Sequence, residues 1–146
     1  MPVYPEDESI TQILADVGLI SSIDLAQAKE QAGITSKGVL QILLETGRLT
    51  EMDITKTLAN QFGLDTVDLN KYEVPQDVLA LVPRDLARQL TVLPIFKRGS
   101  QLTVAIANPL NMEAVDKLGE SLSLTIQPVV SCLSDIEAAL DRYYGR

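Results

Sequence analysis

Histidine and tryptophan are absent from the 146-residue sequence, and cysteine occurs only once, as Cys132. Without histidine, neither a Ser–His nor a Cys–His nucleophilic pair can form, and zinc sites built from His and Cys clusters are excluded. We therefore expect no catalytic residues, no enzyme activity and no metal site in this chain. A single cysteine cannot form an internal disulfide, and its apolar context predicts a buried, inert thiol.

Long apolar runs and basic patches are also missing. No stretch approaches about 20 consecutive apolar residues, and the N-terminus lacks the basic start and apolar core of a signal peptide. The 12 basic residues are outnumbered by 20 acidic ones, which gives a net charge of −8. Such a charge disfavours nucleic acids and anionic membrane surfaces and suits a basic protein partner. We expect a cytoplasmic protein without direct membrane insertion.

The first 64 residues contain an internal duplication. The segment 18–25, Gly-Leu-Ile-Ser-Ser-Ile-Asp-Leu, returns as Gly-Arg-Leu-Thr-Glu-Met-Asp-Ile at 47–54, an offset of 29 residues. Each copy is preceded by apolar residues at helical spacing, and its glycine suits the left-handed end of a helix. Ser21 with Asp24, and Thr50 with Asp53, resemble capping boxes that start a second helix.

Each copy therefore predicts two helices joined by a tight turn. The expected apolar stripes are Ile10, Ile13, Leu14 and Val17; Leu25, Ala28 and Ala32; Val39, Leu40, Ile42, Leu43 and Leu44; and Ile54, Leu58 and Phe62. A single helical hairpin cannot bury its apolar stripe, whereas two can cover each other. We predict a four-helix bundle, formed by the duplicated hairpin, as a subdomain at 1–64.

The second half, 65–146, has the pattern of a separate α/β subdomain. Strand–helix–strand over 102–130 implies a parallel right-handed crossover, and Pro94 places its strand at a sheet edge. The predicted fold class is α+β, with the bundle followed by a small three-stranded sheet covered by helices. The expected elements are an extended segment at 66–69, short helices at 74–82 and 84–89, strands at 91–96 and 102–107, a helix at about 111–122, a strand at 124–130 and a final helix from 133.

Four segments in this order resemble a known family: the duplicated unit, the stretch 82–88, the Ala-Ile-Ala-Asn-Pro-Leu segment at 105–110 and the closing helix at 135–144. Together they are similar to the N-terminal domain, of the MshEN or GspE N-terminal type, of the ATPases that drive type II secretion and type IV pilus assembly. Asn108 departs from the Asp that this family usually has before Pro109.

The resemblance implies a non-catalytic domain that docks such an ATPase, or competes with one, at an inner-membrane platform protein. It implies a location at the inner face of the inner membrane, reached through the partner. Some members of the family bind cyclic di-GMP, although no cofactor is required. The chain lacks a Gly-x-x-x-x-Gly-Lys-Ser/Thr loop for triphosphate, so it is either a fragment of an ATPase or a stand-alone domain.

The resemblance also supplies a candidate nucleotide site. The nucleotide-binding repeat begins Arg-Leu-Gly, but the corresponding triplets here are Ser-Ile-Thr at 9–11 and Gly-Val-Leu at 38–40. Ala32 stands at the position of the closing Gln in the first copy, next to Gln31. The positions that do match the motif are Ile10, Leu14, Gly18, Leu19, Leu25, Val39, Leu43, Gly47, Leu49, Ile54, Leu58 and Gln61.

The matching positions are mostly apolar ones that a helical bundle needs in any case. The missing ones are the cationic and glycine positions that a phosphodiester and a guanine base would use. Lys29, Lys37 and Arg48 are the alternative source of phosphate contacts, and the simpler interpretation is that they are solvated surface charges. We therefore favour docking to a machine protein over sensing of cyclic di-GMP.

Overall fold

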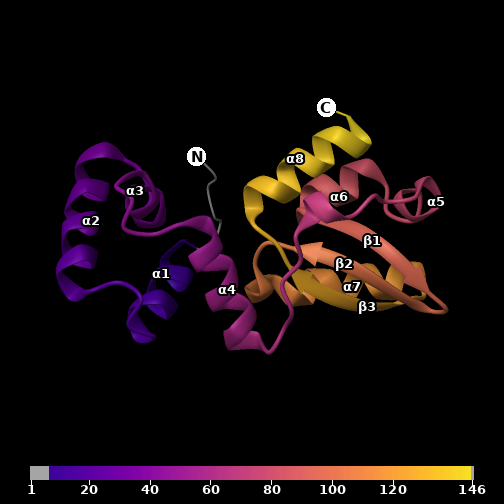
Figure 1. Ribbon diagram of the computed structural model, residues 1–146, viewed down its shortest axis with the longest axis horizontal. Helices are drawn as coiled ribbons and strands as arrows, with labels where there is room; N and C mark the ends of the chain where they lie inside the picture. The colour runs from indigo at the N-terminus through magenta and orange to yellow at the C-terminus, as the bar shows by residue number, and fades with distance from the viewer. Residues whose placement is uncertain (1–6, 146) are drawn as a thin grey trace. The chain divides into compact units, whose positions relative to one another are not determined.

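The computed structural model describes residues 7–145 and divides the chain into two compact units, Met1–Thr57 and Leu58–Arg146 (Figure 1). The division falls inside a helix, α4 (Glu51–Phe62), so this helix contributes to both units. The boundary after residue 64 that the sequence suggests therefore stays a prediction.

The first unit is helical. It contains α1 (Asp7–Asp16), α2 (Ser22–Thr35), α3 (Val39–Glu45) and the beginning of α4. The short helix α3 contacts both α1 and α2. Apolar side chains from these helices that are at most 3% exposed make up the core: Ile10, Leu14, Ala28, Leu40, Leu43 and Ile54. The four predicted helices are thus present, and α3 packs against both α1 and α2.

Both copies of the repeat make the predicted turn. Gly18 and Gly47 have φ angles of 81° and 75°, a left-handed conformation that favours glycine. After each glycine, the next backbone N–H donates back into the helix, from Leu19 to the Leu14 carbonyl at 3.0 Å and from Arg48 to the Leu43 carbonyl at 3.1 Å. These are the bonds of a Schellman-type helix end.

The helix starts that follow are capped as predicted, but differently in the two copies. The Thr50 hydroxyl accepts a bond from the Asp53 N–H at 3.1 Å, and the Thr50 N–H donates to the Asp53 carboxylate at 3.0 Å. This is a reciprocal capping box. In the first copy the Ser21 hydroxyl accepts from the Asp24 N–H at 3.1 Å, while the Asp24 carboxylate pairs with Arg48.

Two positions of the predicted apolar stripes are wrong. Val17 is 46% exposed because α1 ends at Asp16, so Val17 already lies in the turn. Phe62 is 41% exposed because it is the last residue of α4 and precedes Gly63, which leaves the helix with a positive φ. In both cases the exposed residue lies at the end of its helix, where no following turn covers it.

The second unit carries the α/β part (Figure 1). Its strands are ordered β1-β2-β3; β1 and β2 form an antiparallel hairpin, and β2 and β3 are parallel. The predicted three-stranded sheet with a crossover helix is confirmed. After α4, the elements are η1 (Leu69–Lys71), α5 (Gln76–Leu79), α6 (Arg84–Leu90), β1 (Val92–Arg98), β2 (Gln101–Ile106), η2 (Pro109–Asn111), α7 (Met112–Leu122), β3 (Thr125–Val130) and α8 (Leu133–Tyr144).

Helices cover this sheet. The crossover helix α7 approaches β3 so closely that a Cβ atom added at Gly119 would lie 2.9 Å from the Ile126 side chain. Helices α5, α6 and α8 contact β1, and α8 also contacts β2. Cys132 is buried at the start of α8, as its context predicts. Pro94 lies in the edge strand β1, next to a register shift between Pro94 and Phe96.

The segment before the sheet differs from the prediction of an extended stretch at 66–69. Only Thr66 forms a bridge, which is parallel and joins it to Val130 at the end of β3. The chain then turns into the 3-10 helix η1, because the Asp68 carboxylate accepts a bond from the Asn70 N–H at 3.0 Å. Leu69 is buried as part of this turn rather than of a strand.

Candidate functional site

The apolar positions of the candidate nucleotide motif mostly form core. The fully buried ones, each at most 2% exposed, are Ile10, Leu14, Leu43, Leu49, Ile54 and Leu58. Leu25 and Val39 are half-buried. Side chains with so little accessible surface are needed by the fold and present little to a ligand.

The remaining motif positions are exposed: Gly18, Leu19, Gly47 and Gln61. At Gly18 and Gly47 an added Cβ would meet no atom within 4 Å, so no crowding requires glycine there. Their positive φ angles are sufficient reason for the residue type. These glycines therefore act as turn residues.

The candidate positions do not belong to a single compact unit. Leu58 and Gln61 lie in the second unit, and the other motif positions lie in the first. Gln61, the one polar residue among the motif-matching positions, is thus in a different unit from both motif glycines. The nucleotide site that the motif outlines stays a prediction.

A hollow of about 420 Å³ lies between α2 and α3 in the first unit. Its floor is apolar, with Ala28, Ile42 and Leu43, and its polar lining comes from Asp24, Gln27, Glu30, Gln31, Thr46 and Arg48. The lining contains two carboxylates and one guanidinium, and that guanidinium is paired with Asp24. This charge balance does not favour an anionic ligand.

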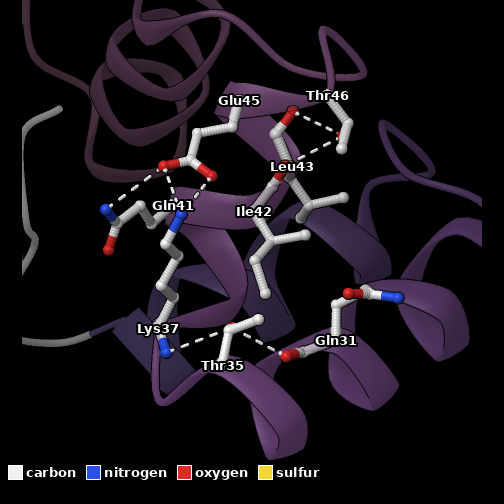
Figure 2. A network of polar contacts seen from close by, with 8 residues as sticks. All are labelled: Gln31, Thr35, Lys37, Gln41, Ile42, Leu43, Glu45 and Thr46. Atoms are coloured by element: carbon white, nitrogen blue, oxygen red, sulfur yellow. Dashed lines mark hydrogen bonds and ion pairs between the residues drawn. The ribbon is translucent and has the colours of Figure 1, made fainter.

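The cations suggested as phosphate contacts are largely engaged within the first unit. Lys37 forms an ion pair with Glu45 at 3.0 Å, and Gln41 donates to the same carboxylate at 3.4 Å (Figure 2). Arg48 pairs with Asp24, whereas Lys29 is exposed. Ion pairs that are this exposed to solvent contribute at most about 1 kcal/mol each. They therefore compete with a phosphate for Lys37 and Arg48, but they are too weak to prevent phosphate binding.

Sequence reasoning missed most of this hollow. Gln27 and Gln31 are four residues apart on α2 and line the hollow together, a spacing that was visible in the sequence. The partner of Asp24 was not visible, because Asp24 matches the capping-box position and its carboxylate pairs instead with a residue 24 positions away. A long-range pair of this kind leaves no local signal.

The parts of the chain that the structure describes contain no group of three or more potential metal ligands. Within the same residues, no helix is both long and apolar enough to cross a bilayer. Burial raises the pKa of the Tyr144 phenol to about 12, and its hydroxyl donates to the Leu79 and Val82 carbonyls at 3.1 and 3.0 Å. These contacts fix the end of α8 and present no reactive group.

The helical repeat followed by a mixed three-stranded sheet defines a small α+β domain. The MshEN domain family matches residues 62–146, and the chain belongs to this family. The structure of MshE with cdg covers 92% of this chain and 98% of its own, with 28% identity and a TM-score of 0.73. The N-terminal domain of XpsE shares the fold, with 24% identity, a TM-score of 0.70, and 99% and 100% of the two chains covered.

Two curated relatives are much longer. The type IV pilus assembly ATPase PilB of Myxococcus xanthus is 32% identical over 92% of this chain and 24% of its own length. The type II secretion system protein E of Xanthomonas campestris pv. campestris is 27% identical over 94% of this chain and 25% of its own. This chain therefore spans about a quarter of the length of either relative.

Proposed function

We propose that this chain is a non-catalytic docking and regulatory domain of a type II secretion or type IV pilus assembly ATPase. It binds an inner-membrane platform protein or another protein of the machine, and so acts in the cytoplasm at the inner face of the inner membrane. The observation that carries this proposal is the use of the repeat: apart from the exposed Leu19 and Gln61, its retained positions are apolar residues of the helices and turn glycines, which hold the fold.

Two further features support a protein partner. The net charge of −8 suits a basic surface, and exposed apolar side chains remain at the turn between α1 and α2, where Leu19 and Ile23 are 41% and 69% exposed. The corresponding positions of the second copy hold Arg48 and Met52. Met52 is itself 47% exposed, so the two copies differ in surface character at one position, where the first has apolar Leu19 and the second has charged Arg48. The first copy is thus the more apolar one, as expected when only one of them is covered by a partner.

A pull-down with the cytoplasmic domain of the platform protein tests the proposal. The full chain should be retained on the immobilised domain and should compete with the matching ATPase for it. Leu43→Asp, which places a charge in the core, should lose both effects because it unfolds the first unit. Absence of binding to any protein of the machine would overturn the proposal.

The alternative is a sensor of cyclic di-GMP, which we read as the cdg of the MshE structure; the likeness to that structure favours it. Calorimetry with the dinucleotide separates the two functions. A Kd below about 10 μM, or about −7 kcal/mol, would favour the sensor, and Arg48→Ala should then weaken binding because one cation near the hollow is lost. Our proposal predicts no heat of binding at that concentration.

A further inference from the structure

A second hollow, of about 500 Å³, lies within the second unit. It crosses one face of the sheet, from Phe96 on β1 over Thr103 on β2 to Gln127 on β3, and reaches the segment that holds Asp65 and Thr66. Tyr72 also lines it. We call this hollow the aromatic groove, because Tyr72 and Phe96 line it while remaining 45% and 42% exposed.

The pairing of the strands explains why these side chains meet. Phe96 is the register partner of Thr103, and Thr103 is the partner of Gln127, so the three form one row across the sheet. Side chains alternate between the two faces of a strand, so this row lies opposite Ile126, which faces α7. The register shift between Pro94 and Phe96 adds a residue to β1 and brings both Ile95 and Phe96 to the groove.

Backbone bonds hold the other side of the groove in place. The segment at 65–67 is tied to β3 by bonds from the Val67 N–H to the Val130 carbonyl at 2.9 Å and from the Val130 N–H to the Asp65 carbonyl at 2.8 Å. The Tyr143 hydroxyl donates to the Tyr72 carbonyl at 3.3 Å. The groove is therefore formed before any ligand arrives, which lowers the entropy cost of binding.

The chemistry of the groove selects a cation. Among the residues that the structure describes, Asp65 is the one charged residue that lines the groove, and none of the lining residues is a Lys or Arg. Within residues 7–145, no hydrogen bond or ion pair engages the side chains of Asp65, Tyr72 or Thr103, although Thr103 is only 8% exposed. A carboxylate beside exposed aromatic rings suits a positively charged group, which interacts favourably with the ring faces. The Asp65 carboxylate would repel an anion at the same place.

We propose that the aromatic groove binds an arginine or lysine side chain that an exposed segment of a protein partner presents. The aliphatic part of that side chain lies against Tyr72 and Phe96, and its charged end pairs with the Asp65 carboxylate. The Thr103 hydroxyl oxygen is a further acceptor, and so is the Gln127 amide oxygen, which also accepts a bond from the Gln101 amide at 3.3 Å. This inference rests on the proposed docking function and names the chemistry of one contact in it. The overall negative charge assists the approach of such a partner.

NMR titration of the isotope-labelled full chain with N-acetyl-L-arginine methylamide tests the groove directly. Backbone amide shifts should be confined to the residues that line the groove and their chain neighbours, at 65–67, 72, 95–96, 103, 127 and 129. N-acetyl-L-leucine methylamide and N-acetyl-L-glutamate methylamide at equal concentration should give much smaller shifts. Equal shifts with the leucine compound, or arginine-induced shifts located elsewhere, would overturn the proposal.

Two variants and a matched control show whether the groove residues themselves bind the arginine compound. Asp65→Asn keeps the backbone bonds of the 65–67 segment but removes the charge, and should weaken arginine binding about fivefold or more. Phe96→Ala should weaken it as well. Glu137→Gln removes one exposed carboxylate from α8 and should leave binding unchanged. If Asp65→Asn behaves like Glu137→Gln, the proposal is wrong.

The pull-down separates this inference from the docking function. If the platform domain retains both the original chain and Asp65→Asn equally, docking stands and the groove is not its contact. If the arginine compound binds the groove but no machine protein binds the chain, the groove stands and the docking function fails. Loss of retention with Asp65→Asn but not with Glu137→Gln would support both.

Discussion

At the scale of single residues, side chains near the end of α8 show how a polar group joins segments that are distant in the sequence. The Tyr144 hydroxyl donates to two carbonyls of the 79–82 stretch, while Tyr143 bonds the backbone at Tyr72 and Val74. The sequence places these tyrosines on the last helix but gives no hint of their partners. Such contacts depend on the tertiary packing of α8, which no local pattern encodes.

We predict that Tyr144→Phe changes the alkaline stability of the chain. The folded-state pKa of about 12 exceeds the usual value of 10, so the folded chain keeps a proton that the unfolded chain loses. The contribution of this phenol to the free energy of unfolding is fully present below pH 10 and is lost as the pH rises towards 12. Tyr144→Phe should lower the free energy of unfolding at pH 7 by about 1 kcal/mol and flatten the decline. Urea unfolding at several pH values measures both effects. If the free energy of unfolding of the variant and of the original chain declined in parallel with pH, the Tyr144 phenol would not be the cause of the decline.

At the scale of helices and strands, the sequence predicted most of the order and many of the ends. Glycines followed by Ser or Thr with a later Asp mark both turns of the repeat, because these residues satisfy helix-terminal groups locally. The hairpin, the parallel crossover and the edge position of Pro94 were also predictable from alternation and chain order. The bulge before Phe96 was not, because it depends on how β1 meets β2.

The capping box of α4 provides a test at this scale. Thr50→Ala removes the hydroxyl that accepts the Asp53 N–H bond, and should lower the free energy of unfolding by about 1 kcal/mol. Thr50→Ser keeps a hydroxyl and should restore most of that loss. Urea denaturation followed by circular dichroism measures the difference. Equal stability of the two variants would show that the cap contributes nothing.

Two helical glycines should respond in opposite ways to the same substitution. In Gly119→Ala the new Cβ atom would lie 2.8 Å from the Leu124 carbonyl oxygen, so we expect a loss of about 1–3 kcal/mol in unfolding free energy. Gly33 in α2 has no atom within 4 Å of that position, and Gly33→Ala should stabilise by up to about 1 kcal/mol. Thermal unfolding compares the two. Unchanged or higher stability of Gly119→Ala would argue against the close packing of α7 on β3.

At the scale of the whole molecule, the boundary between the units decides which residues fold together. The sequence suggests a division after residue 64, where the helical pattern ends and the α/β pattern begins. The structure groups Leu58 with the second unit, and the family match begins at residue 62. The periodicity of apolar residues identifies α4 as a helix, but it does not show whether the last turns of α4 pack with the first unit or with the second.

Two fragments distinguish these boundaries. A fragment of residues 58–146 contains Leu58 and Ala59, which are 0% and 3% exposed, whereas a fragment of residues 65–146 lacks them. If the last turns of α4 belong to the second unit, the longer fragment should be more stable by about 2 kcal/mol, the value of one buried leucine. Urea unfolding of both fragments gives the comparison. Equal stability would favour the boundary after residue 64.

The parallel bridge between Thr66 and Val130 has a consequence for biosynthesis. The β1–β2 hairpin is local and can pair as soon as it leaves the ribosome, but β3 is translated only after α7. Until β3 arrives, the segment at 65–67 lacks its backbone partner and the outer edge of β2 is unpaired. The nascent second unit is therefore open to mispairing for the time needed to translate residues 107–130, and slower translation of this interval should increase its demand for chaperones.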